Sequence, residues 1–173
     1  MQIRVAVAAD HAAIRALHLP VFGEEGEAVA ALALALLADE TARPVLALVA
    51  EVEGEVVGSV IFSAVQVTGS EDVPARILAP LAVAGRCQRQ GIGRALVEQG
   101  LERLRAQGVR LVFVLGDPQY YGRFGFSHRH RVQAPYPPVF PEAWMALALQ
   151  DEALDAVDGR LQCACSLDRP ELW

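Results

Sequence analysis

The sequence predicts a single α+β domain in which helices cover a mixed β-sheet. The chain has 173 residues, 53% of them hydrophobic and 21% charged, so it has enough apolar side chains for one sizeable core. Residues 46–67 hold two β-branched runs around a Glu-Gly-Glu turn, which is typical of an antiparallel hairpin. Residues 76–116 read as an apolar run, an amphipathic helix and a second apolar run. This order is typical of two parallel strands joined by a helix.

The N-terminal part predicts one strand and two helices. Residues 3–8 (IRVAVA) favour a short strand, and Asp10 is a suitable N-cap for a helix that continues to Leu19. Pro20 and its neighbour Gly23 interrupt this helix. The stretch 24–40 predicts a second helix, with acidic residues in its first turn as the helix dipole prefers.

The middle of the chain predicts a strand, a helix, a strand and a short helix. Residues 76–83 (RILAPLAV) are almost continuously apolar, which indicates a strand buried on both faces. Residues 91–108 are the clearest helix, because apolar residues recur at the 3.6-residue spacing and a glycine ends it. Residues 109–116 are the second strand, reached by a right-handed crossover. An Asp-Pro pair then opens a short helix over 117–124.

The C-terminal part predicts further strands around an irregular loop. Strands are expected over 125–134 and 144–150, and the Pro-rich residues 135–143 lie between them. The tail 151–173 predicts one short helix over 151–157 and one edge strand over 160–166. We find no internal repeat and no linker. Residues 1–173 therefore form one domain, and residues 151–173 either belong to its core or extend it.

Charge and cysteine content exclude several classes of protein. A formal net charge of −6 argues against a nucleic-acid partner, because phosphate neutralisation needs basic stripes. The three cysteines form no disulfide framework, and the C-x-C pair Cys163 and Cys165 has too few ligands nearby for a metal site. The longest apolar run, 28–38, is too short to span a bilayer, and the N-terminus has no signal peptide. We expect a cytoplasmic protein without metal or membrane partner, as a monomer or a homodimer.

The junction between the strand 76–83 and the helix 91–108 predicts an anion site. It reads GRCQRQGIGR, and its glycines can turn successive N–H groups toward one point at the start of a helix. A P-loop needs Lys and Ser or Thr after its glycine, and a dinucleotide loop needs a third glycine; both are missing here. The pattern is instead Q-x-x-G-x-G, formed by Gln88, Gly91 and Gly93. A tight turn with solvated arginines is the other interpretation.

The surrounding residues resemble the GNAT superfamily of N-acetyltransferases. The resemblance is sharpest over residues 78–126, which give in order a strand, Q-x-x-G-x-G, a helix, a strand and a short helix with a tyrosine before Gly125 and Phe126. The segments LAPLAV and LGDPQYYGRFGF also resemble those of a bacterial subgroup of predicted N-acetyltransferases. The resemblance implies a mostly antiparallel central sheet with a splayed parallel strand pair, flanked by helices. It also implies acetyl-CoA as cosubstrate and an amine as acceptor.

The resemblance implies which residues hold the cofactor. Strand backbone should pair with the pantetheine arm, and the loop should hold the diphosphate. Pro80 agrees with an open strand edge, because a residue without an N–H belongs at a bulge or edge; a purely structural bulge is the alternative. The implied cofactor-binding residues are Leu81, Ala82, Val83, Gln88, Arg89, Gln90, Gly91, Ile92, Gly93 and Arg94.

The implied catalytic residue is Tyr121, in the place where the family commonly has the tyrosine that protonates the departing thiolate. A phenol with a pKa of about 10 can protonate a thiolate whose conjugate acid has a pKa of about 8.5. A backbone N–H near Leu81 to Val83 would stabilise the oxyanion. Tyr121 alternatively only packs, and Tyr120 is the weaker candidate. The sequence does not identify the general base. Glu24, Glu25 and Glu27 could bind a cationic amine but fit a solvated first turn of a helix, and His128 and His130 fit a solvated strand edge.

Two other functions fit the same sequence. A non-catalytic acyl-CoA-binding regulatory module would have the same fold and the same loop. A nucleotide-binding domain would use the loop for another diphosphate. The prediction is an N-acetyltransferase that moves an acetyl group from acetyl-CoA to a primary amine by direct attack in a ternary complex.

Overall fold

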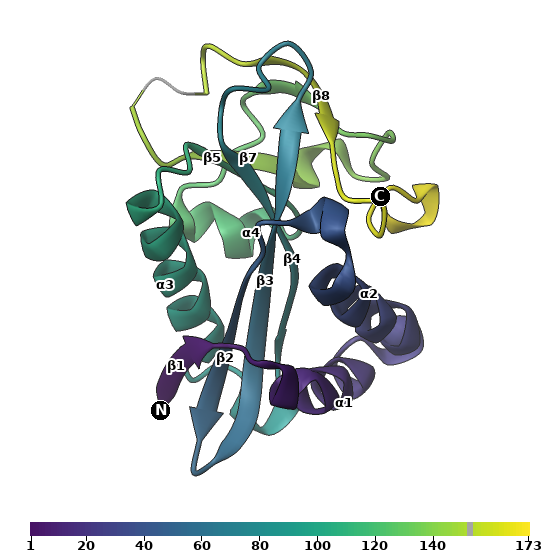
Figure 1. Ribbon diagram of the computed structural model, residues 1–173, viewed down its shortest axis with the longest axis vertical. Coiled ribbons are helices and arrows are strands. Elements are labelled where there is room, and N and C mark those ends of the chain that lie inside the picture. The colour runs from purple at the N-terminus through teal and green to yellow at the C-terminus, as the bar shows by residue number, and fades with distance from the viewer. Residues whose placement is uncertain (152–153) are drawn as a thin grey trace.

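The computed structural model describes residues 1–151 and 154–173, which form a mixed sheet between helices (Figure 1). The main sheet has the strand order β1-β2-β3-β4-β5-β7. All of its neighbouring pairs are antiparallel except β4 and β5. The strands are β1 (Gln2–Val5), β2 (Leu46–Val52), β3 (Glu55–Val67), β4 (Ala75–Val83), β5 (Leu111–Leu115), β6 (Arg131–Gln133), β7 (Trp144–Ala148) and β8 (Asp158–Gln162). The predicted fold class is confirmed.

Helices cover both faces of the sheet. The α-helices are α1 (His11–Val21), α2 (Gly26–Ala38), α3 (Ile92–Ala106) and α4 (Pro118–Tyr121). Figure 1 shows α3 on one side of the long strands and α1 and α2 on the other. Alternate residues of β3 serve the two sides, because successive side chains point to opposite faces. Ile61 packs in the α1–α2 core and Phe62 in the α3 core, and both are fully buried.

Most of the expected elements form where the sequence predicts them. The hairpin 46–67 is β2 and β3, the unit 76–116 is β4, α3 and β5, and Asp117 caps α4 by accepting from the N–H of Gln119. The predicted strand over 125–134 is largely wrong: only β6 and one bridge at Ser127 form. The segment changes partner between these two parts, because Ser127 bridges to Ala146 of β7 whereas β6 pairs with β8.

Two further boundaries differ from the prediction. The helix α1 passes through Pro20 and ends at Val21, so Pro20 does not stop it. The predicted helix over 151–157 includes residues 152–153, which lie outside the described residues, and its residues 154–156 form a turn. The predicted edge strand 160–166 is β8, which pairs with β3 and β6 and ends at Gln162.

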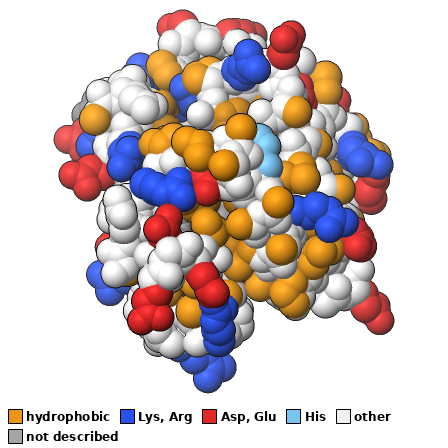
Figure 2. Space-filling view, turned by 60° about the horizontal axis from the view of Figure 1, so that its bottom comes forward, with side chains coloured by type: hydrophobic (Ala, Val, Ile, Leu, Met, Phe, Trp, Pro, Cys, Tyr) orange, Lys and Arg blue, Asp and Glu red, His pale blue; other side chains and the backbone are white. Residues whose placement is uncertain are grey.

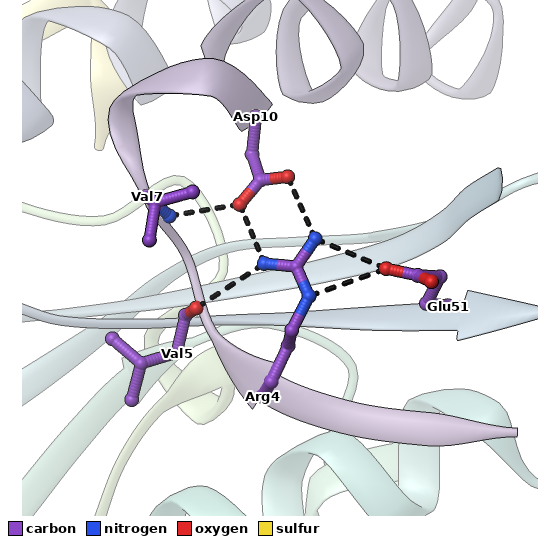
Figure 3. A network of polar contacts seen from close by, with 5 residues as sticks. All are labelled: Arg4, Val5, Val7, Asp10 and Glu51. Atoms are coloured by element: carbon purple, nitrogen blue, oxygen red, sulfur yellow. Dashed lines mark hydrogen bonds and ion pairs between the residues drawn. The ribbon is translucent and has the colours of Figure 1, made fainter. Parts of the chain in front are cut away.

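The carboxylate of Asp10 has a role that differs from the predicted N-cap. A 3-10 turn, Ala8–Asp10, precedes α1, and the carboxylate of Asp10 accepts from the N–H of Val7 at 2.8 Å. It also accepts two hydrogen bonds from Arg4, at 2.8 and 2.9 Å. Arg4 binds Glu51 of β2 as well (Figure 3). Asp10 therefore joins the start of the first helix to the edge of the sheet.

Replacing Asp10 with asparagine is expected to lower the free energy of unfolding at pH 7 by about 1–2 kcal/mol, because a charge-assisted bond to a partly exposed Arg is lost. The bonds from Arg4 lower the pKa of Asp10 to about 2. Their contribution is therefore complete above about pH 4 and is lost as the pH falls toward about 2. Urea unfolding of both proteins should show a difference that shrinks to near zero over this range. Asp72→Asn, at an exposed site, is the control; an equal loss there would contradict the assignment.

The parallel strands β4 and β5 separate after three residue pairs. Ala75, Arg76 and Ile77 pair with β5, and no pair follows along the strands. A bulge on β4 lies beside this point, because Leu78 faces Phe62 while Leu81 faces Val60 across β3. Ala79 and Pro80 lie opposite the single residue Ile61, so β4 has one extra residue here. A bulge suits Pro80, which has no N–H to donate. The second half of β4 is therefore open toward β5.

The surface mixes both signs of charge. On the face drawn in Figure 2, acidic and basic side chains lie interspersed around an apolar area rather than in a basic stripe. No helix formed by residues 1–151 and 154–173 is long and apolar enough to cross a membrane.

Candidate functional site

The loop between β4 and α3 presents a row of free backbone N–H groups. Gly91 is the N-cap of α3 with φ +83°, and Arg89 has φ +62°, so the chain turns twice through the left-handed region. Within the described residues, the N–H groups of 89–94 donate to no protein acceptor. The first intrahelical bond runs from the N–H of Ala95 to the carbonyl of Gly91. A helix start with unpaired N–H groups favours an anion.

The side chains of the Q-x-x-G-x-G motif brace this loop. Gln88 donates through Nε2 to the carbonyl of Val83 at 3.0 Å, and Gln90 donates to the carbonyl of Arg86 at 3.2 Å. Both side-chain amides therefore bond to backbone carbonyls next to the loop and do not point away from it. Arg94 is paired with Glu98 at 2.7 Å. Arg89 has no carboxylate partner among the described residues, so its charge is available beside the free N–H groups.

In the open half of β4, two of the three predicted residues point their backbone N–H groups into the space between β4 and β5. The N–H of Ala84 donates to Val57 of β3 at 2.8 Å. Bonding directions alternate along an antiparallel strand, so Ala82 also bonds toward β3. The N–H groups of Leu81 and Val83 then point away from β3, toward the edge of β4 that is no longer paired with β5. Of the predicted strand residues, Leu81 and Val83 thus have N–H groups free for a ligand, and Ala82 does not. The carbonyl of Val83 already accepts from Gln88.

Tyr121 lies at the end of β5, against the backbone of Gly116. A Cβ atom on Gly116 would come within 2.5 Å of Cε2 of the tyrosine ring, so only glycine permits this approach. The ring also packs edge-on against Phe126, with 5.9 Å between centroids. Burial raises the pKa of Tyr121 above its ordinary value of 10.0. Its phenol therefore keeps its proton at neutral pH, as a general acid must.

Tyr120 takes a position that the sequence did not predict. A Cβ atom on Gly93 would lie 2.6 Å from the Tyr120 hydroxyl and 3.5 Å from Cγ2 of Val83. The hydroxyl therefore lies at the first turn of α3, and Arg123 covers the other side of the ring at 4.7 Å. The two tyrosines serve different places, because neighbours on a helix point about 100° apart. That offset, together with the close Gly93, is the signal that could have placed Tyr120 at the loop.

A cleft of about 1060 Å³ lies between the separated strands and α2. Leu81 and Tyr121 both line it, whereas Gln88 and residues 89–94 do not. Its other walls come from α2, from the loop 139–143 and from residues 167–173. The sequence did not predict the last two walls, because neither carries a periodic pattern. Tyr121 thus faces a large space beside the open strand.

The acidic and histidine candidates for the general base separate in the structure. Glu25 lines the cleft, while Glu24 does not and Glu27 pairs with Arg15 at 3.2 Å. His130 has a structural role, because its Nε2 lies 3.0 Å from the carbonyl of Trp144 and its Nδ1 accepts from Val132. Burial lowers the pKa of His130, which favours the neutral ring. His128 is exposed and lines no wall of the cleft.

The cysteines and acidic residues form no metal centre in the part of the chain that the structure describes. No group of three or more His, Cys, Asp or Glu side chains there could hold a metal ion. Cys163 and Cys165 are free thiols, and burial raises the pKa of Cys163 to about 12.

The profile of the acetyltransferase (GNAT) family matches residues 10–126. The chain belongs to the GNAT family. This family member is 39% identical over 163 residues to the N-acetyltransferase YjhQ of Escherichia coli K12. The aligned region covers 90% of this chain and 87% of YjhQ. The assignment agrees with the resemblance seen in the sequence.

Solved structures of two relatives share the fold of this GNAT chain. The GNAT N-acetyltransferase YhbS of Escherichia coli, in complex with CoA, superposes with a TM-score of 0.85 at 36% identity, over 97% of this chain and 92% of that one. A GNAT acetyltransferase of Brucella melitensis, in complex with acetyl-CoA, gives a TM-score of 0.78 at 30% identity, over 96% and 97%. Both relatives were therefore crystallised with a CoA-type ligand.

Proposed function

We propose that this GNAT chain is an N-acetyltransferase that moves the acetyl group of acetyl-CoA to a primary amine. The observation that carries the proposal is that Tyr121 and the open edge of β4 line the same cleft, beside a loop of free N–H groups. The CoA and acetyl-CoA complexes of the two relatives support the same cosubstrate. The reaction is direct attack by the amine on the thioester within a ternary complex.

The loop and β4 position the cosubstrate. N–H groups of residues 89–94, with the helix dipole of α3 and the charge of Arg89, bind the diphosphate. Gln88 and Gln90 keep the loop in shape through their bonds to backbone carbonyls. The pantetheine arm extends β4 as an added strand would, and accepts hydrogen bonds from the outward N–H groups of Leu81 and Val83. This fixes the thioester beside Tyr121, and such orientation accounts for much of an acyl-transfer rate.

The chemical step then needs an oxyanion donor and an acid. The outward N–H of Leu81 donates to the thioester oxygen as the tetrahedral intermediate forms. Tyr121 donates its phenolic proton to the sulfur as the C–S bond breaks, and CoA leaves as a thiol. The attacking amine loses its proton through water. Among the described residues no histidine lines the cleft, and its carboxylates lie on turns and loops rather than on β4.

The test is release of free thiol from acetyl-CoA by the purified protein with a panel of primary amines. An N-acetyltransferase gives amine-dependent thiol release and an acetylated product in equal amounts. A non-catalytic acyl-CoA-binding module would bind acetyl-CoA and release thiol with none of the amines. A thermal-shift comparison of CoA with NAD and ATP separates both from a nucleotide-binding domain, which would be stabilised by the nucleotides instead.

A further inference from the structure

We propose that the acceptor is an amine with a sizeable apolar body and no carboxylate group. This rests on the proposed function, since it concerns the part of the same cleft that the acceptor would occupy.

The walls of the cleft are mostly apolar. Side chains of α2 form one wall, residues of β4 and β5 form the floor, and residues 167–173 close the far end. Trp173 is held there by a hydrogen bond from its Nε1 to the carbonyl of Leu167 at 2.9 Å. The apolar side chains include Phe22, Val29, Leu32, Leu115, Leu172 and Trp173. An acceptor with many hydroxyl groups would lose hydrogen bonds to water here without replacement.

Every charged residue that lines the cleft is acidic. These residues are Glu25, Asp117, Glu142 and Glu171, and no Lys, Arg or His among the described residues lines it. Asp117 is occupied in capping α4, and Glu171 is paired with Arg169 at 3.0 Å. Glu25 and Glu142 have no ion-pair partner in the described part of the chain.

Glu25 and Glu142 therefore give the cleft a net negative rim. They attract an ammonium group and repel a carboxylate that arrives with it. An α-amino acid carries both charges on one carbon, so the cleft discriminates against it. An amine without a carboxylate is attracted by Glu25 and Glu142 and has no group that they repel.

The turn that carries Glu142 is tied to the catalytic end of the cleft. It is the 3-10 turn Pro141–Ala143, and the carbonyl of Ala143 accepts from the N–H of Gly116 at 3.0 Å. Gly116 is also the residue against which Tyr121 packs. A cation held by Glu142 is therefore positioned relative to Tyr121 through a short stretch of backbone.

Two apolar side chains at the rim remain uncovered. Val139 is 76% exposed and Phe140 is 65% exposed, and both line the cleft. They are among the few large apolar side chains that this chain leaves open to solvent. An exposed apolar rim around a cleft marks a place where a ligand supplies the missing contacts. The apolar body of the amine covers these two side chains.

The test measures kcat/KM with three amines at saturating acetyl-CoA. The first is 2-phenylethylamine, the second is phenylalanine, which adds one carboxylate, and the third is ethylamine, which lacks the apolar ring. The expected kcat/KM for 2-phenylethylamine is at least tenfold above each of the other two. Equal values for 2-phenylethylamine and phenylalanine, or for 2-phenylethylamine and ethylamine, would overturn the proposal.

Charge variants test which carboxylate acts. Glu142→Gln is expected to raise the KM for 2-phenylethylamine three- to tenfold and to reduce discrimination against phenylalanine, with the KM for acetyl-CoA unchanged. Glu102→Gln, the same change at an exposed site on α3, is the matched control and should alter neither. Unchanged discrimination in both Glu142→Gln and the double variant Glu25→Gln/Glu142→Gln would overturn the acidic rim.

The failure of this inference can be told apart from failure of the proposed function. If the protein binds acetyl-CoA in a calorimeter and acetylates an amine, but prefers phenylalanine or ethylamine, only the acceptor class is wrong. If acetyl-CoA gives no binding heat and no amine yields thiol, both proposals fall together.

Discussion

Tyr121→Phe is expected to lower kcat by at least ~100-fold, because a general acid contributes about 10²–10⁴ to such a step. The KM for acetyl-CoA should change by less than about threefold, since the diphosphate and pantetheine contacts lie elsewhere. A loss in kcat without a loss in binding is what removal of a transition-state interaction produces. The measurement is steady-state thiol release over a range of acetyl-CoA concentrations.

The matched control for this variant is Tyr136→Phe. It removes the same hydroxyl from a side chain that bonds to Asp168 at 2.9 Å and lines no wall of the cleft. Its kcat should stay within about twofold of wild type, as expected of a surface substitution. If Tyr121→Phe turned over as fast as Tyr136→Phe, the tyrosine would have a packing role only.

Gly93→Val is expected to weaken CoA binding by at least ~10-fold, or about 1.4 kcal/mol. The new Cβ would lie 2.6 Å from the Tyr120 hydroxyl, so that side chain must move. The branched methyl groups would also occupy space in front of the free N–H groups that the diphosphate approaches. Isothermal titration of CoA into both proteins measures the change directly.

A glycine with room around it provides the control for this substitution. Gly122→Ala adds a Cβ that meets no atom within 4 Å, and its φ of −57° suits any residue. CoA binding to Gly122→Ala should equal that of wild type. Thermal unfolding of Gly93→Val without ligand shows whether the fold itself is retained. A folded Gly93→Val protein that binds CoA normally would contradict the role given to the loop.

Local sequence signals predicted the parts of the site that depend on backbone shape. The glycines and Gln88 indicated the loop, and the structure places free N–H groups there. Pro80 indicated an interruption in the strand, and a bulge lies at that residue. The shape of the loop and the bulge follow from local sequence, because glycine frees the backbone and proline restricts it wherever they occur.

Parts of the site that depend on distant contacts could not be predicted. Residues 167–173 reach the cleft because Trp173 packs against Trp144, with 5.4 Å between ring centroids. No periodic pattern in the sequence predicts this contact between Trp173 and Trp144. The irregular course of 125–134 follows from a change of partner, because Ser127 bridges to β7 and Arg131–Gln133 pair with β8. Tertiary bonds of this kind override local propensity.

In the proposed complex, backbone N–H groups of residues 89–94 bind the diphosphate of coenzyme A. The most direct measurement is the amide ¹H–¹⁵N spectrum of the protein during titration with CoA and, separately, with pantetheine, which lacks the diphosphate. We predict that CoA shifts the amide resonances of 89–94 strongly and that pantetheine leaves them in place while shifting those of Leu81 and Val83. Saturable CoA binding that leaves the amides of 89–94 unshifted would contradict the account.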